Sequence, residues 1–98
     1  GRYTLGGLEV MVQGKQAVLV QGGALAGSAT SLPDCVRTAV YEMGIPLETA
    51  VSCATINPAK RLGQWQRRGS LTPGKIADLV LWDESLRLQA VMKSGKWL

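Results

Sequence analysis

The residues best suited to chemistry in this sequence are the glycines of stretch 22–28, which reads Gly-Gly-Ala-Leu-Ala-Gly-Ser. Glycines let backbone amides approach a ligand closely, and the N-terminus of the helix expected to follow favours negative charge. The stretch is not a Walker A loop, because no Lys-Ser or Lys-Thr pair follows Gly27. A plain connection from a strand to a helix is the alternative interpretation, and it stays open.

Side chains that commonly catalyse reactions or bind metals are few. The chain has no histidine, which removes histidine metal ligands and histidine general bases. Asp78 and Asp83 flank an expected strand and would lie about 16 Å apart at roughly 3.3 Å per residue, so we expect turn and surface roles for them. Cys35 and Cys53 lack a Cys-x-x-Cys spacing, and we expect two reduced, buried thiols. These residues alone provide no catalytic site and no metal site.

Charge and aromatic residues argue against nucleic acid or a membrane as the partner. The net charge is +4, and the basic residues are spread along the chain, whereas a nucleic-acid module carries a denser stripe. Trp65 before Arg67 and Arg68 could form a basic–aromatic patch, but we favour an indole that packs over a domain junction. Trp82 and Trp97 are expected to pack between sheets. No apolar run approaches the roughly 18 residues that a membrane helix needs.

The first part of the chain has the pattern of paired strands. Apolar and polar residues alternate before Gly14, and a short apolar run follows it, which predicts a hairpin within residues 1–21. Residues 22–30 are then predicted to be a glycine-rich loop that leads into a helix.

Three helices are predicted over residues 31–63. Ser31 is a good N-cap for the first helix, which Gly44 ends. A second helix follows Pro46, and a third opens with Asn57 as its cap. Each helix has apolar residues at helical spacing, so each needs a partner to cover one face.

The last third of the chain returns to strand patterns. Pro73-Gly74 predicts a type II turn, in which the glycine takes a positive φ. Strands are predicted over residues 77–82 and 86–92, with a further turn at Ser94-Gly95. The chain is therefore expected to be of α/β class.

Two motifs in this region resemble a known family. Residues 57–63 read Asn-Pro-Ala-Lys-Arg-Leu-Gly, and residues 69–80 read Gly-Ser-Leu-Thr-Pro-Gly-Lys-Ile-Ala-Asp-Leu-Val. Together they resemble the C-terminal signature of the amidohydrolase superfamily, where a metal-dependent TIM barrel passes into a small β-sandwich. The resemblance implies that residues 1–66 end the barrel, with the hairpin, a substrate loop at 22–30 and the helices, and that residues 67–98 supply C-terminal strands of the sandwich.

Residues upstream of these two motifs resemble one family within the superfamily. Residues 2–7, the hairpin and the Leu-Ala-Gly-Ser stretch look like the N-acetylglucosamine-6-phosphate deacetylase family, in which that loop lies over the substrate. The resemblance therefore makes Leu25, Ala26 and Gly27 the candidate substrate-binding residues, and Gly27 is expected to need a positive φ as well as space for the sugar. Leu32 and Cys35 depart from residues frequent in the family, Met and Ala, at apolar helix positions.

The implied activity is hydrolysis of N-acetylglucosamine 6-phosphate to glucosamine 6-phosphate and acetate, a step of amino-sugar catabolism in the cytoplasm. The family uses one divalent metal, zinc or similar. Its ligands (a Glu and two His), a catalytic Asp and a phosphate-binding Arg and His are expected upstream of Gly1. Because the start has neither Met nor a signal-peptide pattern, we expect a chain cut from a longer one and inactive alone. Its expected partners are the amino-sugar phosphate, the remainder of the enzyme and further copies in a homo-oligomer.

Three alternatives stay open from the sequence. Another amidohydrolase, dihydroorotase-like or deaminase-like, would carry the same tail. A small basic binding module belongs to a different class, which scattered charge disfavours. The third is a purely structural segment with no function of its own.

Overall fold

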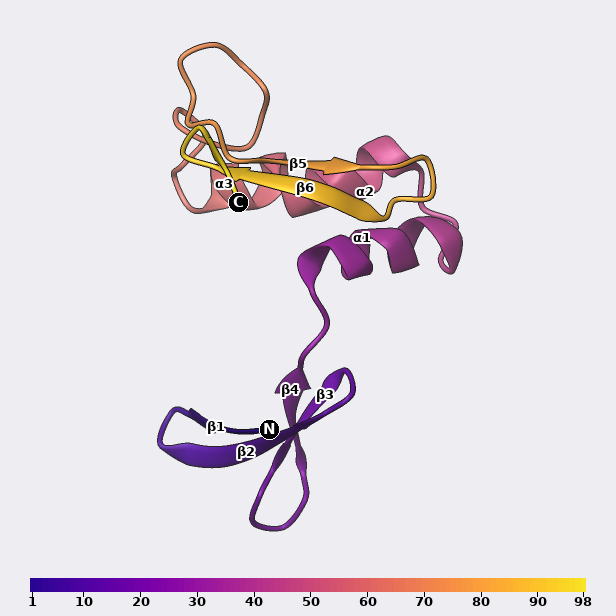
Figure 1. Ribbon diagram of the computed structural model, residues 1–98, viewed down its shortest axis with the longest axis vertical. Coiled ribbons are helices and arrows are strands. Elements are labelled where there is room, and N and C mark those ends of the chain that lie inside the picture. Colours follow the sequence, from indigo (N-terminus) through magenta and orange to yellow (C-terminus); the bar gives the residue numbers. More distant parts are fainter. The chain divides into compact units, whose positions relative to one another are not determined.

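Two compact units, Gly1–Ser31 and Leu32–Leu98, make up the chain in a computed structural model that describes residues 1–98 (Figure 1). The expected mixture of helices and strands is confirmed, since the chain forms two antiparallel sheets and a group of helices. The boundary expected after residue 66 concerns the domains of a whole enzyme and stays a prediction. None of the helices has the length and apolar character needed to cross a membrane.

The first unit is a four-stranded antiparallel sheet whose strands lie side by side in chain order. These are β1 (Arg2–Leu5), β2 (Leu8–Gln13), β3 (Gln16–Leu19) and β4 (Leu25–Ser28). The predicted hairpin is confirmed: β2 pairs antiparallel with β3, and Gly14 lies in the turn between them with a φ of +61°.

The predicted loop over residues 22–30 is wrong in its second half, because residues 25–28 form a strand. Gly22 and Gly23 both adopt positive φ and reverse the chain tightly, so that β4 pairs with β3. The amide of Leu19 donates to the carbonyl of Ala24 at 2.8 Å and closes this reversal. Alanine and glycine have low strand propensity, so only the pairing with β3 reveals the strand.

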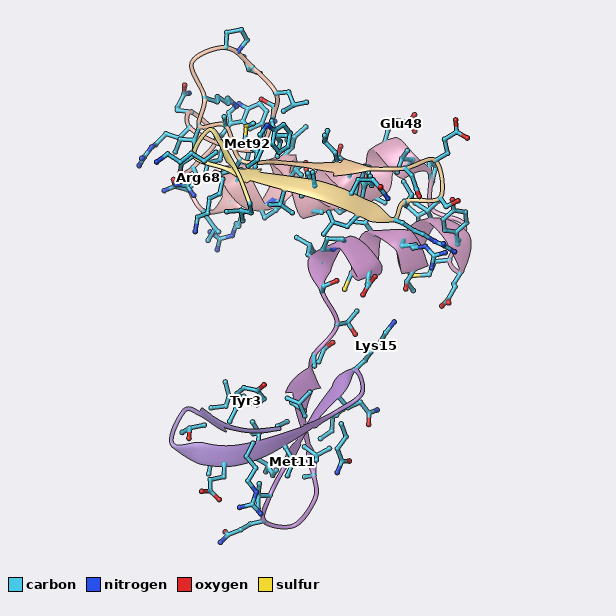
Figure 2. The ribbon with its side chains drawn as sticks, in the orientation of Figure 1. Tyr3, Met11, Lys15, Glu48, Arg68 and Met92 are labelled. Carbon is cyan, nitrogen blue, oxygen red and sulfur yellow. The ribbon has the colours of Figure 1, made fainter.

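One face of this sheet is apolar, and it is covered near Val10 but exposed at the edge strand. The register places Tyr3, Val10 and Leu19 on one face, because paired residues point to the same side. Met11 lies on the opposite face (Figure 2). Val10 is buried, at 3% exposed, whereas Tyr3 at the sheet edge is 61% exposed.

The second unit begins with three helices joined by short connections. They are α1 (Leu32–Tyr41), α2 (Leu47–Ala54) and α3 (Ile56–Arg61). As predicted, Gly44 follows the first helix, with a φ of +70°, and Pro46 stands directly before the second. Each helix buries one small or β-branched side chain: Val36, Ala50 and Ala59.

The predicted cap of the third helix is wrong. The helix begins at Ile56, so Asn57 lies inside its first turn and its amide approaches the sulfur of Cys53 at 3.9 Å. Thr55 takes the N-cap position, and its hydroxyl donates to the carbonyl of Val51 at 2.7 Å. Because one residue separates α2 from α3, no extended residue is left at position 57 to act as a cap.

A three-stranded antiparallel sheet completes the unit, in the order β5 (Leu79–Trp82), β6 (Leu88–Lys93) and β7 (Lys96–Trp97). The type II turn before it is confirmed: the amide of Lys75 donates to the carbonyl of Thr72 at 3.1 Å, and Gly74 has a φ of +92°. Trp82 is half-buried, but Trp97 is 56% exposed, so the prediction that it packs between sheets is wrong for this chain.

Leu86 does not begin the second strand, as the apolar pattern predicted. It adopts a φ of +58° and is buried, at 8% exposed, within the turn between β5 and β6. Helix α1 holds this turn, because Arg37 Nε donates to the carbonyl of Ser85 at 3.2 Å and the Tyr41 hydroxyl donates to the carbonyl of Glu84 at 3.4 Å. Because of these tertiary contacts, β6 begins at Leu88.

Candidate functional site

The three candidate substrate-binding residues stand in a row on β4, the last strand of its sheet. Because β4 has β3 on one side only, its outer edge presents backbone N–H and C=O groups without a strand partner. Such groups can hydrogen-bond the hydroxyl and amide groups of a sugar without involving any side chain.

A bulge in the pairing turns these residues in different directions. Leu25 pairs with Val18, while Gly27 pairs with Ala17, so Ala26 is an extra residue opposite the β3 backbone. Neighbouring residues of β3 face opposite sides of the sheet, and therefore Leu25 and Gly27 do too. Leu25 is 66% exposed, which leaves an apolar side chain available as a wall.

Gly27 has room around it rather than an unusual backbone. Its φ is not among the positive values of the chain, so the expectation that it needs a positive φ is wrong. A Cβ built at Gly27 would meet nothing within 4 Å. A larger side chain would therefore change the space beside β4 and leave the strand intact.

A surface hollow in this sheet lies away from these residues. It is lined by residues from the start of β2, the end of β3 and the adjoining turns: Gly7, Leu8, Glu9, Leu19 and Gln21. None of the candidate residues on β4 lines this hollow.

Both aspartates that the sequence singled out organise turns. The Asp83 carboxylate accepts hydrogen bonds from the amides of Ser85 and Arg87, each at 2.9 Å. The Asp78 carboxylate accepts one from the amide of Ser94 at 2.8 Å and lies 3.9 Å from the Arg68 guanidinium. The expected turn and surface roles are confirmed.

The cysteines are free, as expected, but both are exposed, so the predicted burial is wrong. Cys35 stands on α1 and Cys53 on α2, on helix faces that the rest of this small chain does not cover. No group of three or more His, Cys, Asp or Glu side chains lies together, so the residues present do not fit a metal site.

Trp65 has a setting that the sequence did not reveal. The ammonium groups of Lys75 and Lys60 lie 3.4 and 4.9 Å from the centre of its ring. The sequence offered a basic–aromatic patch from Arg67 and Arg68 only as the less favoured alternative, and the cations that contact the ring come from lysines instead. Lys75 is ten residues away across the type II turn, a spacing that carries no sequence signal.

Comparison with known proteins identifies the family of the chain. The model of the amidohydrolase family matches residues 8–98, which is most of the chain. The chain belongs to the amidohydrolase family. The match includes both motifs at 57–63 and 69–80 and the strand β4 with its three candidate residues.

Individual relatives show which members of the family the chain resembles. The chain is 38% identical over 96 residues to the N-acetylglucosamine-6-phosphate deacetylase of Bos taurus, covering 98% of this chain and 24% of the relative. It is 40% identical over 96 residues to the N-acetylgalactosamine-6-phosphate deacetylase of Escherichia coli O157:H7, covering 98% of this chain and 25% of the relative. The resemblance to the deacetylases is thus confirmed, and the chain spans about a quarter of the length of these relatives.

The amidohydrolase chain also matches solved deacetylase structures. One is a mutant N-acetyl-D-glucosamine-6-phosphate deacetylase from Mycobacterium smegmatis in complex with N-acetyl-D-glucosamine-6-phosphate. The match has a TM-score of 0.76 at 37% identity and covers 99% of this chain and 26% of that one. The two sheets and the helices between them are therefore a recurring part of such deacetylases.

Proposed function

We propose that the full-length protein containing this segment hydrolyses the acetamide of N-acetylglucosamine 6-phosphate, giving glucosamine 6-phosphate and acetate. The observation that carries this proposal is the match of 98% of the chain, at 38% identity, to a deacetylase of that name. A deacetylase structure holding this sugar phosphate, similar over 99% of the chain, supports it.

In this proposal the segment is the C-terminal part of the enzyme. Residues 1–66 end a TIM barrel and residues 67–98 add strands to a β-sandwich. The uncovered apolar side chains in both units favour it, among them Leu8 at 58% and Leu62 at 74% exposed, because they need a larger body to cover them. The enzyme would act in the cytoplasm as a homo-oligomer.

The contribution of the segment to the site would come from β4. Backbone groups at its free edge would hydrogen-bond the sugar, Leu25 would form an apolar wall, and Gly27 would leave space for close approach. Amidohydrolases usually depend on a divalent metal, zinc or similar. This segment has no ligand set for one, so the proposal places the ligands and the catalytic groups outside it.

The test is a comparison of Gly27→Val and Cys35→Ala in the full-length enzyme. Valine suits a strand, and nothing within 4 Å opposes its Cβ, so the fold should be preserved. We expect Gly27→Val to lower kcat/KM by roughly 100-fold through a displaced substrate. Cys35→Ala trims an exposed position on α1 and should change kcat/KM by less than about twofold.

Thermal unfolding of both variants checks that neither change acts through stability. If Gly27→Val enzyme with an unchanged melting temperature keeps wild-type kcat/KM, β4 does not contact the substrate.

The epimeric sugar is the second candidate substrate, because identity to the N-acetylgalactosamine-6-phosphate deacetylase is 40%. The two substrates differ in one hydroxyl, and both expose the same acetamide and phosphate. Measuring kcat/KM for both sugar phosphates separates the candidates, with dihydroorotate and adenine as substrates for other amidohydrolase activities. The proposal fails if the enzyme turns over only one of the latter two.

A further inference from the structure

The whole net positive charge of the chain arises within residues 60–78. This stretch holds five of the 11 basic residues and one of the seven acidic ones, so the rest of the chain is neutral in sum. The five are Lys60, Arg61, Arg67, Arg68 and Lys75, and the acidic residue is Asp78. Figure 2 shows Arg68 toward one end of the second unit and Glu48 toward the other.

Two of these basic residues lie beside the ring of Trp65. Lys60 stands near the end of α3 and Lys75 follows the type II turn, and both place their ammonium groups within 5 Å of the ring centre. An indole face attracts cations, which offsets the repulsion between the two lysines. The ring is neutral, however, so it leaves their positive charges uncompensated.

The cluster is held in place before any ligand binds. Gly69 packs so tightly that a Cβ there would lie 2.8 Å from the Cβ of Ala59 and 3.3 Å from Cε3 of Trp65, which fixes the ring against α3. Lys75 Nζ also donates to the carbonyl of Arg68 at 3.5 Å. A preorganised pair of cations loses less conformational entropy when it captures an anion.

The carboxylate of this stretch already has partners other than the two lysines. Asp78, the one carboxylate of the stretch, accepts from the Ser94 amide and faces Arg68. A lysine ammonium has three donors, and one of those on Lys75 is used on the Arg68 carbonyl. Donors therefore remain on both lysines for an external anion.

We propose that Lys60 and Lys75, held over Trp65, bind the phosphoryl group of a small phosphomonoester. Two ammonium groups beside one ring supply two positive charges for a dianion, and lysine commonly binds phosphate as a point charge. The ring that would stack a nucleobase is occupied by the lysines themselves, which disfavours single-stranded nucleic acid. The site lies in the second unit, whereas the candidate residues of β4 belong to the first.

The reactivity of individual lysines tests this proposal in the full-length protein. Each ε-amine is acetylated with limiting acetic anhydride and quantified by mass spectrometry, with inorganic phosphate or with sodium chloride at equal ionic strength. For a site of millimolar affinity, about 10 mM phosphate should slow acetylation of Lys60 and Lys75 several-fold. Lys93, the last residue of β6, and Lys96, the first residue of β7, serve as controls and should not change.

Variants separate a specific site from general screening. Lys75→Gln should abolish the protection of Lys60 by phosphate, whereas Lys75→Arg keeps the charge and should retain it. Equal protection by chloride, equal protection of Lys96, or protection of Lys60 that survives Lys75→Gln would each overturn the proposal. Vesicles of phosphatidylcholine with phosphatidic acid form a separate arm, and protection by these vesicles but not by phosphate would overturn the assignment to a small ligand.

Discussion

Gly69 is the position where a single methyl group should do the most damage to the second unit. It has a φ of +100°, and a Cβ there would lie 2.8 Å from the Cβ of Ala59, itself buried on α3. The Thr55 carbonyl and the Trp65 ring, each at 3.3 Å, leave little room to move away. Gly69→Ala therefore combines backbone strain with a steric overlap.

The two contributions can be separated with a matched glycine. Gly74 has a similar φ of +92°, and nothing lies within 4 Å of its added Cβ. Gly74→Ala should cost the conformational term alone, about 1–2 kcal/mol. Gly69→Ala should add an overpacking term of roughly 1–3 kcal/mol, for a total near 2–5 kcal/mol.

Native-state hydrogen exchange of the full-length protein measures these costs locally. The reporters are the amide of Gln64, which donates to the carbonyl of Ala59 at 2.7 Å, and the amide of Ile76, which donates to the carbonyl of Arg67 at 2.9 Å. The opening free energies of these two amides should fall further in Gly69→Ala than in Gly74→Ala. The reason is that only Gly69→Ala disturbs the packing of α3 against the Trp65 ring.

A double variant identifies the overlap itself. Ala59→Gly removes the atom that the new methyl group would meet, so in the Gly69→Ala background it should recover part of the loss despite its own cost of about 1 kcal/mol in a helix. Equal opening free energies for Gly69→Ala and Gly74→Ala, or strictly additive effects of positions 59 and 69, would refute the packing argument.

Other perturbations test separate features. Asp83→Ala removes the acceptor of two backbone amides and should lower the opening free energy of the Arg87 amide by about 1–3 kcal/mol, whereas the neighbouring Glu84→Ala should leave it within about 0.5 kcal/mol. The 98-residue chain, dialysed against Zn²⁺, should retain well below one equivalent by elemental analysis, since no ligand cluster exists; stoichiometric zinc would contradict this. The same chain should self-associate in sedimentation velocity, because Leu71 at 84% and Tyr3 at 61% exposed lack cover, and a monodisperse monomer with cooperative unfolding would count against the segment being part of a larger fold.

Elements specified by local chemistry could be predicted from the sequence. The hairpin around Gly14, the turn at Gly44 that follows α1 and the type II turn at Pro73-Gly74 depend on the conformational range of glycine and proline within a few residues. The turn roles of Asp78 and Asp83 were predictable for the same reason. The amidohydrolase membership could be recognised because residues 57–63 and 69–80 resemble the signature of that family.

Features that depend on a distant partner could not be read from the sequence. Strand β4 exists because β3 lies beside it, and Leu86 enters a left-handed turn because α1 holds the neighbouring carbonyls.

For the candidate site, the sequence alone determined which residues to examine, Leu25, Ala26 and Gly27, through their resemblance to a known family. The tertiary structure decided that they form a bulged edge strand and that Gly27 provides space rather than a special φ. It also brought Lys75 onto Trp65. The physical reason is the same in each case: pairing, burial and ring contacts depend on residues that folding brings together, and spacing along the chain does not encode them.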